Sequence, residues 1–316
     1  MAAGKMNPEQ VWSEWEFERA NLGDTRLNTR LKKLAHDLCA TPEAPINHAS
    51  EDWAATKAAY RFFQNDRVTS EQILKPHQAR TCERMAAEPI VLAIQDTSYL
   101  NFSNHKHTQG LGPIGDSRCA SQGLVTHNIL AVTPQGLPLG LLKQTGWARA
   151  GYNQQTERER KNTSIEHKES YQWIQGIEVV QKLKPARTRV ITLCDRESDI
   201  YEFFVAAQRL EAEFVIRAAW DRHLNDSEWP RLWDHLQAQP VVGSYQLSVP
   251  QRDSKPERFV TLAVRWATAT LAPTQRPKPS LFYPLPPVML DAVYVTEVGA
   301  ADPRTRSNGY CSLTLL

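Results

Sequence analysis

Two short apolar runs, each ending in an aspartate, constrain the fold of this chain more than any other feature. The first is IVLAIQD at residues 90–96, and the second is RVITLCD at residues 189–195. Apolar runs of this length predict buried β-strands, and helical patterns at 167–183 and 199–210 flank the second run. Strands that alternate with helices in this way indicate an α/β fold.

Asp96 and Asp195 would then stand at corresponding strand ends. An aspartate in such a place often caps the next helix or forms a turn, and for either residue alone this structural role is the favoured interpretation. Two strands of one sheet, however, would bring both carboxylates to the edge where α/β proteins bind ligands. Close carboxylates repel unless a cation neutralises them, and hard oxygen ligands suit Mg²⁺ or Mn²⁺. We therefore predict that the pair binds divalent metal and catalyses phosphodiester chemistry.

A change of pattern at Pro89 divides the chain. Before it, residues 9–88 show helical periodicity, including an apolar stripe at Leu27, Leu31, Leu34 and Leu38. From residue 221 onward, alternating apolar patterns and many prolines indicate β-structure, with a proline-dense connector at 273–287. The sequence therefore predicts a helical part, an α/β part and a β-rich part.

The α/β part should contain a hairpin and a loop. The runs at 124–132 and 137–145 predict paired strands, and the polar stretch at 150–163 predicts a loop. His127 lies on the first of these strands, where a core histidine with satisfied hydrogen bonds is the simplest interpretation.

Composition sets only broad limits. The chain has 316 residues and a formal net charge of +2, which does not exclude a DNA-binding protein because a basic surface can be local. Five scattered cysteines without a CxxC pair argue against a disulfide framework or a zinc site. The sequence shows neither a secretory signal nor an apolar stretch long enough for a membrane span, so we expect a cytoplasmic protein without a membrane partner.

The α/β part resembles a known family. LAIQDTSYLNF (92–102), VTHNILAVTPQGLPLGLL (125–142) and VITLCDRESDIYEFF (190–204) are similar to the core of bacterial cut-and-paste transposases of the DDE type. The specific group is the insertion-sequence-four family, whose best-known relative is transposon five. LWDHLQAQPVVGSYQLSVPQ (232–251) resembles the start of this family's β-rich insertion.

The helical part carries the same resemblance. LGDTRLNTRLKKLA (22–35) and DWAATKAAYRFFQNDRVTSEQIL (52–74) resemble the family's N-terminal DNA-binding domain. The matches therefore cover nearly the whole chain and follow the family's order.

The resemblance implies an architecture and a reaction. It implies a helical DNA-binding domain (1–70), a connecting helix (71–89), an incomplete ribonuclease H-like core with a mixed sheet (90–220) and a β-rich insertion (221–316). Asp96 and Asp195 would be the first two acids of the DDE triad, with Mg²⁺ or Mn²⁺ as cofactor. A metal-activated water would nick the transposon end, and the freed 3′-hydroxyl would form a hairpin and then attack target DNA.

The implied partners are double-stranded DNA and other transposase chains. The DNA would be transposon ends and target DNA. The family acts as a dimer on two ends, so a homodimer or a heterodimer with full-length transposase is expected. When bound to DNA, the chain would be associated with the bacterial nucleoid.

The third acid of the family is missing from the resemblance. It is a glutamate in a Y-x-x-R-x-x-x-E-x-x-x-x-x-x-K signature, and no tyrosine after Asp195 is followed by this pattern. Glu297 falls in a strand of the insertion and is a poor substitute. The sequence therefore predicts a truncation before the glutamate, poor metal affinity and little or no strand cleavage.

Five basic residues are the predicted DNA contacts. Arg26, Arg30 and Lys33 recur at spacings of four and three, on one face of a predicted helix. A solvated helix surface is the usual explanation of such a pattern, but the family resemblance favours contact with the DNA backbone. Arg61 and Arg217 are further contacts implied by the resemblance.

Three functions remain open at this point. The first is a DDE transposase. The second is a catalytically inactive protein that binds transposon ends, or a dominant-negative regulator of transposition. The third is an unrelated metal-dependent nuclease of ribonuclease H type, which the N-terminal resemblance disfavours.

Overall fold

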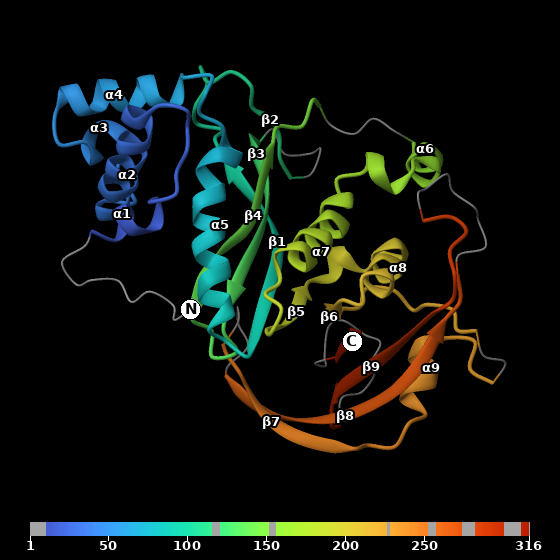
Figure 1. Ribbon diagram of the computed structural model, residues 1–316. Helices are drawn as coiled ribbons and strands as arrows, with labels where there is room; N and C mark the ends of the chain where they lie inside the picture. The colour runs from blue at the N-terminus through green and yellow to red at the C-terminus, as the bar shows by residue number, and fades with distance from the viewer. Residues whose placement is uncertain are drawn as a thin grey trace. The chain divides into compact units, whose positions relative to one another are not determined.

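The computed structural model describes residues 11–115, 121–151, 156–225, 228–251, 257–273 and 282–299, and the backbone of 311–315 (Figure 1). The chain divides into two compact units. The first contains the chain up to Leu92 with Asn128–Gly146 and Leu183–Arg189. The second contains Ala93–His127, Trp147–Lys182 and the chain from Val190 onward.

The N-terminal part is helical, as predicted. Its helices are α1 (Trp12–Glu16), α2 (Thr25–Ala40), α3 (Ile46–Ala49), α4 (Trp53–Phe63) and α5 (Ser70–Ala86).

Side-chain caps begin three of these helices. The Asp24 carboxylate accepts a hydrogen bond from the Arg26 amide at 2.9 Å and begins α2. The Asp52 carboxylate begins α4, and Thr69 begins α5 in a reciprocal capping box with Gln72. Each cap satisfies amide groups that a helix start leaves without partners.

The apolar stripe of α2 faces a small core. Leu31 and Leu34 are buried there with Leu22, Ala59 of α4 and Phe62 of α4. The stripe therefore does what its spacing predicts, and the opposite face of α2 remains at the surface.

A buried carboxylate ties α1 to α5 and to β4 (Pro138–Trp147) within the first unit. Glu16 accepts two hydrogen bonds from Arg84, at 2.8 and 2.9 Å, and lies 2.6 Å from His77 Nδ1. Arg84 also donates to the Leu139 carbonyl at 2.5 Å, and His77 Nε2 accepts from the Leu141 amide at 2.8 Å. Hydrogen bonds and ion pairs therefore connect the last residue of α1 to its neighbours.

The sheet is mixed. Besides β4 its core strands are β1 (Ile90–Asn101), β2 (Gly112–Pro113), β3 (Gln122–Val132), β5 (Arg189–Cys194) and β6 (Glu213–Arg217). They lie in the order β2-β3-β1-β5-β6, and β4 pairs with β3 as the predicted hairpin requires. β5 and β6 are parallel, whereas β2 and β3 are antiparallel. The α/β class is therefore confirmed.

One predicted loop is partly helical. Residues 150–163 contain α6 (Glu157–Asn162), which begins with a capping box between Thr156 and Glu159. A polar, highly charged helix has no apolar stripe to reveal it, so the loop prediction was wrong there. The predicted helices at 167–183 and 199–210 form as α7 (Tyr171–Leu183) and α8 (Tyr201–Arg209).

The β-rich part is also confirmed. β7 (Gly243–Val249), β8 (Arg258–Leu271) and β9 (Val288–Glu297) pair antiparallel, and α9 (Leu232–Gln237) precedes them. The backbone of β10 (Cys311–Leu315) pairs with β9 and β6. Most of the predicted connector at 273–287 lies outside the described residues.

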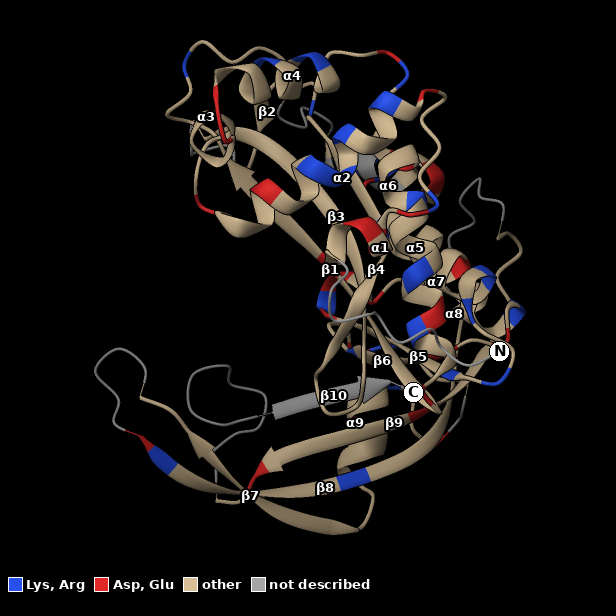
Figure 2. Ribbon diagram, turned by 60° about the vertical axis from the view of Figure 1, so that its left-hand side comes forward, with Lys and Arg blue, Asp and Glu red and all other residues tan. Residues whose placement is uncertain are grey.

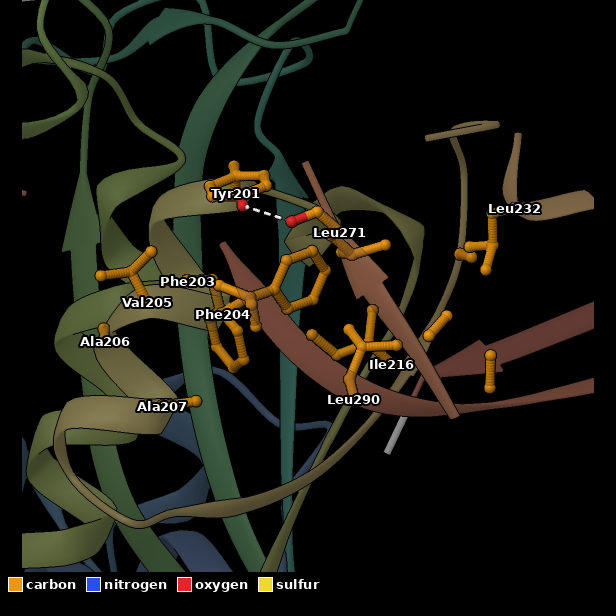
Figure 3. Packing of buried hydrophobic residues seen from close by; sticks show 14 of the residues in the cluster. Tyr201, Phe203, Phe204, Val205, Ala206, Ala207, Ile216, Leu232, Leu271 and Leu290 are labelled. Atoms are coloured by element: carbon orange, nitrogen blue, oxygen red, sulfur yellow. Dashed lines mark hydrogen bonds between the residues drawn. The ribbon is translucent and has the colours of Figure 1, made fainter. Parts of the chain in front are cut away.

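The largest core of the second unit lies against α8. Phe203 and Phe204 are fully buried and pack with Ile216, Leu271 and Leu290 (Figure 3). The Tyr201 hydroxyl donates to the carbonyl of Leu271 at 3.1 Å, shown as the dashed line, and burial raises the pKa of this phenol to about 12. The core thus joins α8 to β6, β8 and β9.

A buried ion pair between Asp199 and Arg222 lies just before α8. The side chain of Asp199 is fully buried and accepts hydrogen bonds from the amides of Ala219 and Trp220, at 2.6 and 2.9 Å. Its carboxylate also accepts from Arg222 Nε at 2.9 Å. The partners of Asp199 lie after β6, and local sequence patterns do not reveal such distant contacts.

Candidate nucleic-acid interface and acidic site

The predicted basic residues of α2 do lie together. Arg26, Arg30 and Lys33, with Thr25 and Thr29, line one open surface pocket. Figure 2 shows Lys and Arg along α2. These cations lie on a face of α2 beside the one that Leu31 and Leu34 bury, where Arg26 is exposed and Arg30 and Lys33 are half-buried.

The three cations differ in how far acids neutralise them. Arg26 makes an ion pair with Asp24 at 2.9 Å, and their hydrogen bonds lower the pKa of Asp24. A hydrogen bond to Glu51 raises the pKa of Lys33, which also lies 3.4 Å from Asp37. Arg30 makes no ion pair with any described residue. It is therefore the cation of α2 with the most uncompensated charge.

A second exposed face lies on α4. Arg61 is exposed, and so are Trp53, Lys57 and Tyr60. Trp53 and Lys57 are four residues apart, and Lys57 and Tyr60 are three apart, which places these three on one face of the helix. Trp53 is 75% exposed and Tyr60 is 49% exposed, which is unusual for large apolar side chains. Sequence reasoning found only Arg61, although the Trp53–Lys57–Tyr60 spacing is visible in the sequence.

Arg217 belongs to the second unit. It is exposed at the last position of β6, opposite Thr314 of β10 in the antiparallel register. Within the described residues it has no ion-pair partner.

The placement of Asp96 needs correction. The sequence predicts that the strand ends before Asp96, but β1 continues to Asn101, and Asp96 is an exposed residue inside it. Thr97 and Tyr99 favour extended backbone, and Thr97 is bonded to the neighbouring strand through His127. The continued pairing explains the longer strand.

Asp195 is placed as predicted, directly after β5, and β5 is the neighbour of β1. Its Oδ1 accepts a hydrogen bond from the Glu197 amide at 2.8 Å and caps the short 3₁₀ helix Arg196–Ser198. The structural role expected of a lone aspartate is thus present, and the carboxylate remains exposed.

The negative charges of both aspartates act on a third acid, Glu197. The pKa of Glu197 is raised first by partial burial of its carboxyl group, and then by the negative charges of Asp195 and Asp96. Three carboxylates therefore share one region of the second unit, which concentrates negative charge there. Glu197 follows Asp195 by two residues, and its sequence position alone does not mark it as part of a site.

A pocket of about 350 Å³ lies beside this region. Its lining includes Thr97, Tyr99, Trp147, Glu169, Trp173 and Glu197. Glu169 accepts hydrogen bonds from Arg149 at 2.7 Å and from Trp147 Nε1 at 3.0 Å, and the Arg149 bond lowers the pKa of Glu169. The pocket therefore has three aromatic side chains in its wall, and of its two acids Glu169 is paired with a cation.

The donor chemistry of Asp96 and Asp195 fits Mg²⁺ or Mn²⁺. Magnesium in phosphoryl-transfer sites is commonly held by one or two carboxylates together with water and substrate phosphate. Within the part of the chain that is described, no three His, Cys, Asp or Glu side chains are grouped so as to hold an ion by themselves.

Comparison with known families identifies the N-terminal part. Residues 9–68 match the family described as transposase DNA-binding. The match covers α1 to α4, including the basic face of α2 and the exposed face of α4. The chain therefore carries a transposase DNA-binding domain.

Among the described residues, no helix combines the length and apolar character needed to cross a bilayer.

Proposed function

We propose that this chain is a DDE transposase that binds transposon-end DNA through residues 9–68 and acts on it with Asp96 and Asp195. The observation that carries the proposal is that β1, which bears Asp96, and β5, which Asp195 follows directly, are neighbouring strands of one sheet. The transposase DNA-binding domain in the same chain supports a DNA substrate. The fold proposed for the second part is a ribonuclease H-like core, consistent with the mixed sheet and the antiparallel strands β7 to β9.

Asp96 and Asp195 would hold Mg²⁺ or Mn²⁺. When bound, the ion supplies Lewis-acid stabilisation of the phosphate charge that develops during strand cleavage. Asp96 is fixed by the pairing of β1, and Asp195 by the hydrogen bond from the Glu197 amide. Pairing of Glu169 with Arg149 reduces the repulsion that an approaching DNA backbone would meet.

Duplex DNA would be held by the faces of α2 and α4. Arg30 and Arg61 lack described acidic partners, so their charge is available to phosphates. Arg26 and Lys33 would have to exchange their acidic partners for phosphate. Trp53 and Tyr60 add an apolar surface beside Arg61, and Arg217 would contribute from the second unit.

The test needs a duplex that the chain recognises. This duplex is obtained by enriching a random-sequence pool for binding to the full chain, and it then serves as the substrate for Mg²⁺-dependent cleavage. We expect wild-type protein to nick it at most slowly, since the residues after Asp195 lack the family's glutamate signature, and we expect D96N and D195N to bind equally well but not to nick. Cleavage that survives both substitutions would contradict the assignment of the acids.

A different outcome would support a regulatory protein. If wild-type protein binds the enriched duplex but cleaves it no faster than D96N does, the chain acts as an end-binding protein that occupies transposon ends. Dimer formation with an active transposase would then be the route to repression.

A further inference from the structure

The residues on either side of Asp96 are held by one buried histidine. Gln95 and Thr97 project from the same face of β1, because alternate side chains of a strand point to the same side. The His127 ring, on neighbouring β3, lies 3.1 Å from Gln95 Oε1 through Nε2 and 3.0 Å from Thr97 Oγ1 through Nδ1. Asp96 projects from the opposite face and is exposed.

The surroundings leave this ring little freedom. His127 is fully buried, and Trp173 of α7 packs edge-on against it with ring centroids 4.7 Å apart. Gly176 of α7 lies so close to the strand that a Cβ there would come within 2.1 Å of Gln95 Oε1. A Cβ at Gly176 would therefore displace the Gln95 amide from its position beside His127.

The chemistry of a neutral imidazole matches this arrangement. It carries one N–H donor and one acceptor nitrogen, so one ring can bridge two polar partners. An apolar ring would fill the same space but would leave buried polar groups without partners, which is costly. Thr97, which belongs to this strand segment, also lines the pocket that contains Glu197. Trp173 of α7 lines the same pocket.

We infer that His127 is a positioning residue that fixes the β1 segment around Asp96 in the geometry required for divalent-cation binding. The inference rests on the proposed function, because it concerns the pair Asp96 and Asp195. His127 acts through Gln95 and Thr97, with which it makes hydrogen bonds on either side of Asp96.

The test measures cation binding without DNA. Mn²⁺ is titrated into the full-length chain, and the free ion is followed by electron paramagnetic resonance. H127F keeps an aromatic ring against Trp173 and removes both hydrogen bonds, and we expect it to raise the Mn²⁺ dissociation constant about tenfold, as loss of supporting hydrogen bonds does at other metal sites. H127N places an amide nitrogen near the Nδ1 position and should recover part of the affinity through Thr97.

Two controls make the outcome decisive. V125A removes packing from the same face of β3, where Val125 is fully buried, and it should lower stability but leave Mn²⁺ affinity unchanged. T97V removes only the hydroxyl that lies 3.0 Å from His127 Nδ1, and we expect it to weaken Mn²⁺ binding about threefold. If H127F does not fold, T97V serves as the test in its place.

Each result has one meaning. Folded H127F, or folded T97V in its place, that binds Mn²⁺ as wild-type protein does would overturn the inference and leave the proposed function standing. Wild-type protein whose Mn²⁺ binding is unaffected by D96N would overturn the proposed metal site, and this inference with it.

Discussion

At the scale of single residues, the two most deeply buried acids among the described residues serve structure. Asp199 and Glu16 each accept several hydrogen bonds, and an arginine is among the donors in both cases. Asp96 and Asp195, in contrast, are exposed. A buried carboxylate with this many partners is costly to disturb, and an exposed pair without them is available for a ligand.

Removal of the Asp199 carboxylate should be strongly destabilising. D199A leaves Arg222 buried without its partner and two amides unsatisfied, and we expect a loss of about 3–5 kcal/mol in the free energy of unfolding. The pair of Arg258 and Glu297 is the control, because the Arg258 side chain is 46% exposed, and R258A should cost about 1 kcal/mol. Urea unfolding followed by tryptophan fluorescence measures both, and equal losses would contradict the structural role of Asp199.

Glu16 should make stability depend on pH. Burial by itself raises the pKa of this carboxyl, but hydrogen bonds from His77 and Arg84 outweigh burial and lower the pKa from 4.5 to about 2. The contribution, about 3 kcal/mol, is complete above pH 4.5 and is lost as the pH falls through 2.

E16Q cannot gain this stabilisation by ionising. The difference in unfolding free energy between wild-type protein and E16Q should therefore narrow as the pH falls from 4.5 towards 2. Unfolding curves at a series of pH values check this. A constant difference would show that Glu16 is not the group responsible.

At the scale of elements, caps and apolar stripes were predictable because they are local. Asp24, Asp52 and Thr69 begin helices within residues 9–88, the part for which the sequence predicts helical periodicity. The extension of β1 past Asp96 was not predictable, because it depends on pairing with strands distant in sequence. The same holds for Asp199, whose partners come after β6.

The contact between β1 and β3 can be tested at a glycine. A Cβ on Gly123 would lie 1.9 Å from the Leu100 carbonyl oxygen, and a backbone atom cannot move aside easily. We expect G123A to cost about 1–3 kcal/mol through strain between these strands. G243A on β7 is the matched control, since no atom lies within 4 Å of its added Cβ. Similar thermal midpoints for both variants would contradict the close approach.

The basic face of α2 makes a prediction about salt. Arg30 has no described acidic partner, so R30A should weaken binding to the enriched duplex. The slope of log affinity against log salt should fall by about 0.9 for each phosphate that Arg30 neutralises. K182A, which removes an exposed lysine of α7 outside residues 9–68, is the control. Fluorescence anisotropy at several salt concentrations distinguishes them, and an unchanged slope for R30A would refute the assignment.

At the scale of the whole molecule, one chain combines a transposase DNA-binding domain with a carboxylate-bearing mixed sheet. The adjacency of β1 and β5 was predictable, because two apolar strands that each lead to an aspartate suit one sheet. The influence of Asp96 and Asp195 on Glu197 was not predictable, and neither were the hydrogen bonds of His127 to β1. Both depend on side chains that only the folded chain brings together.

The most direct measurement compares D96N with R30A on the enriched duplex, with binding and Mg²⁺-dependent nicking followed in the same samples. If one chain both holds and cuts the DNA, D96N binds normally and never nicks, while R30A nicks once its concentration is raised enough to restore binding. Nicking by D96N at the wild-type rate would contradict the account.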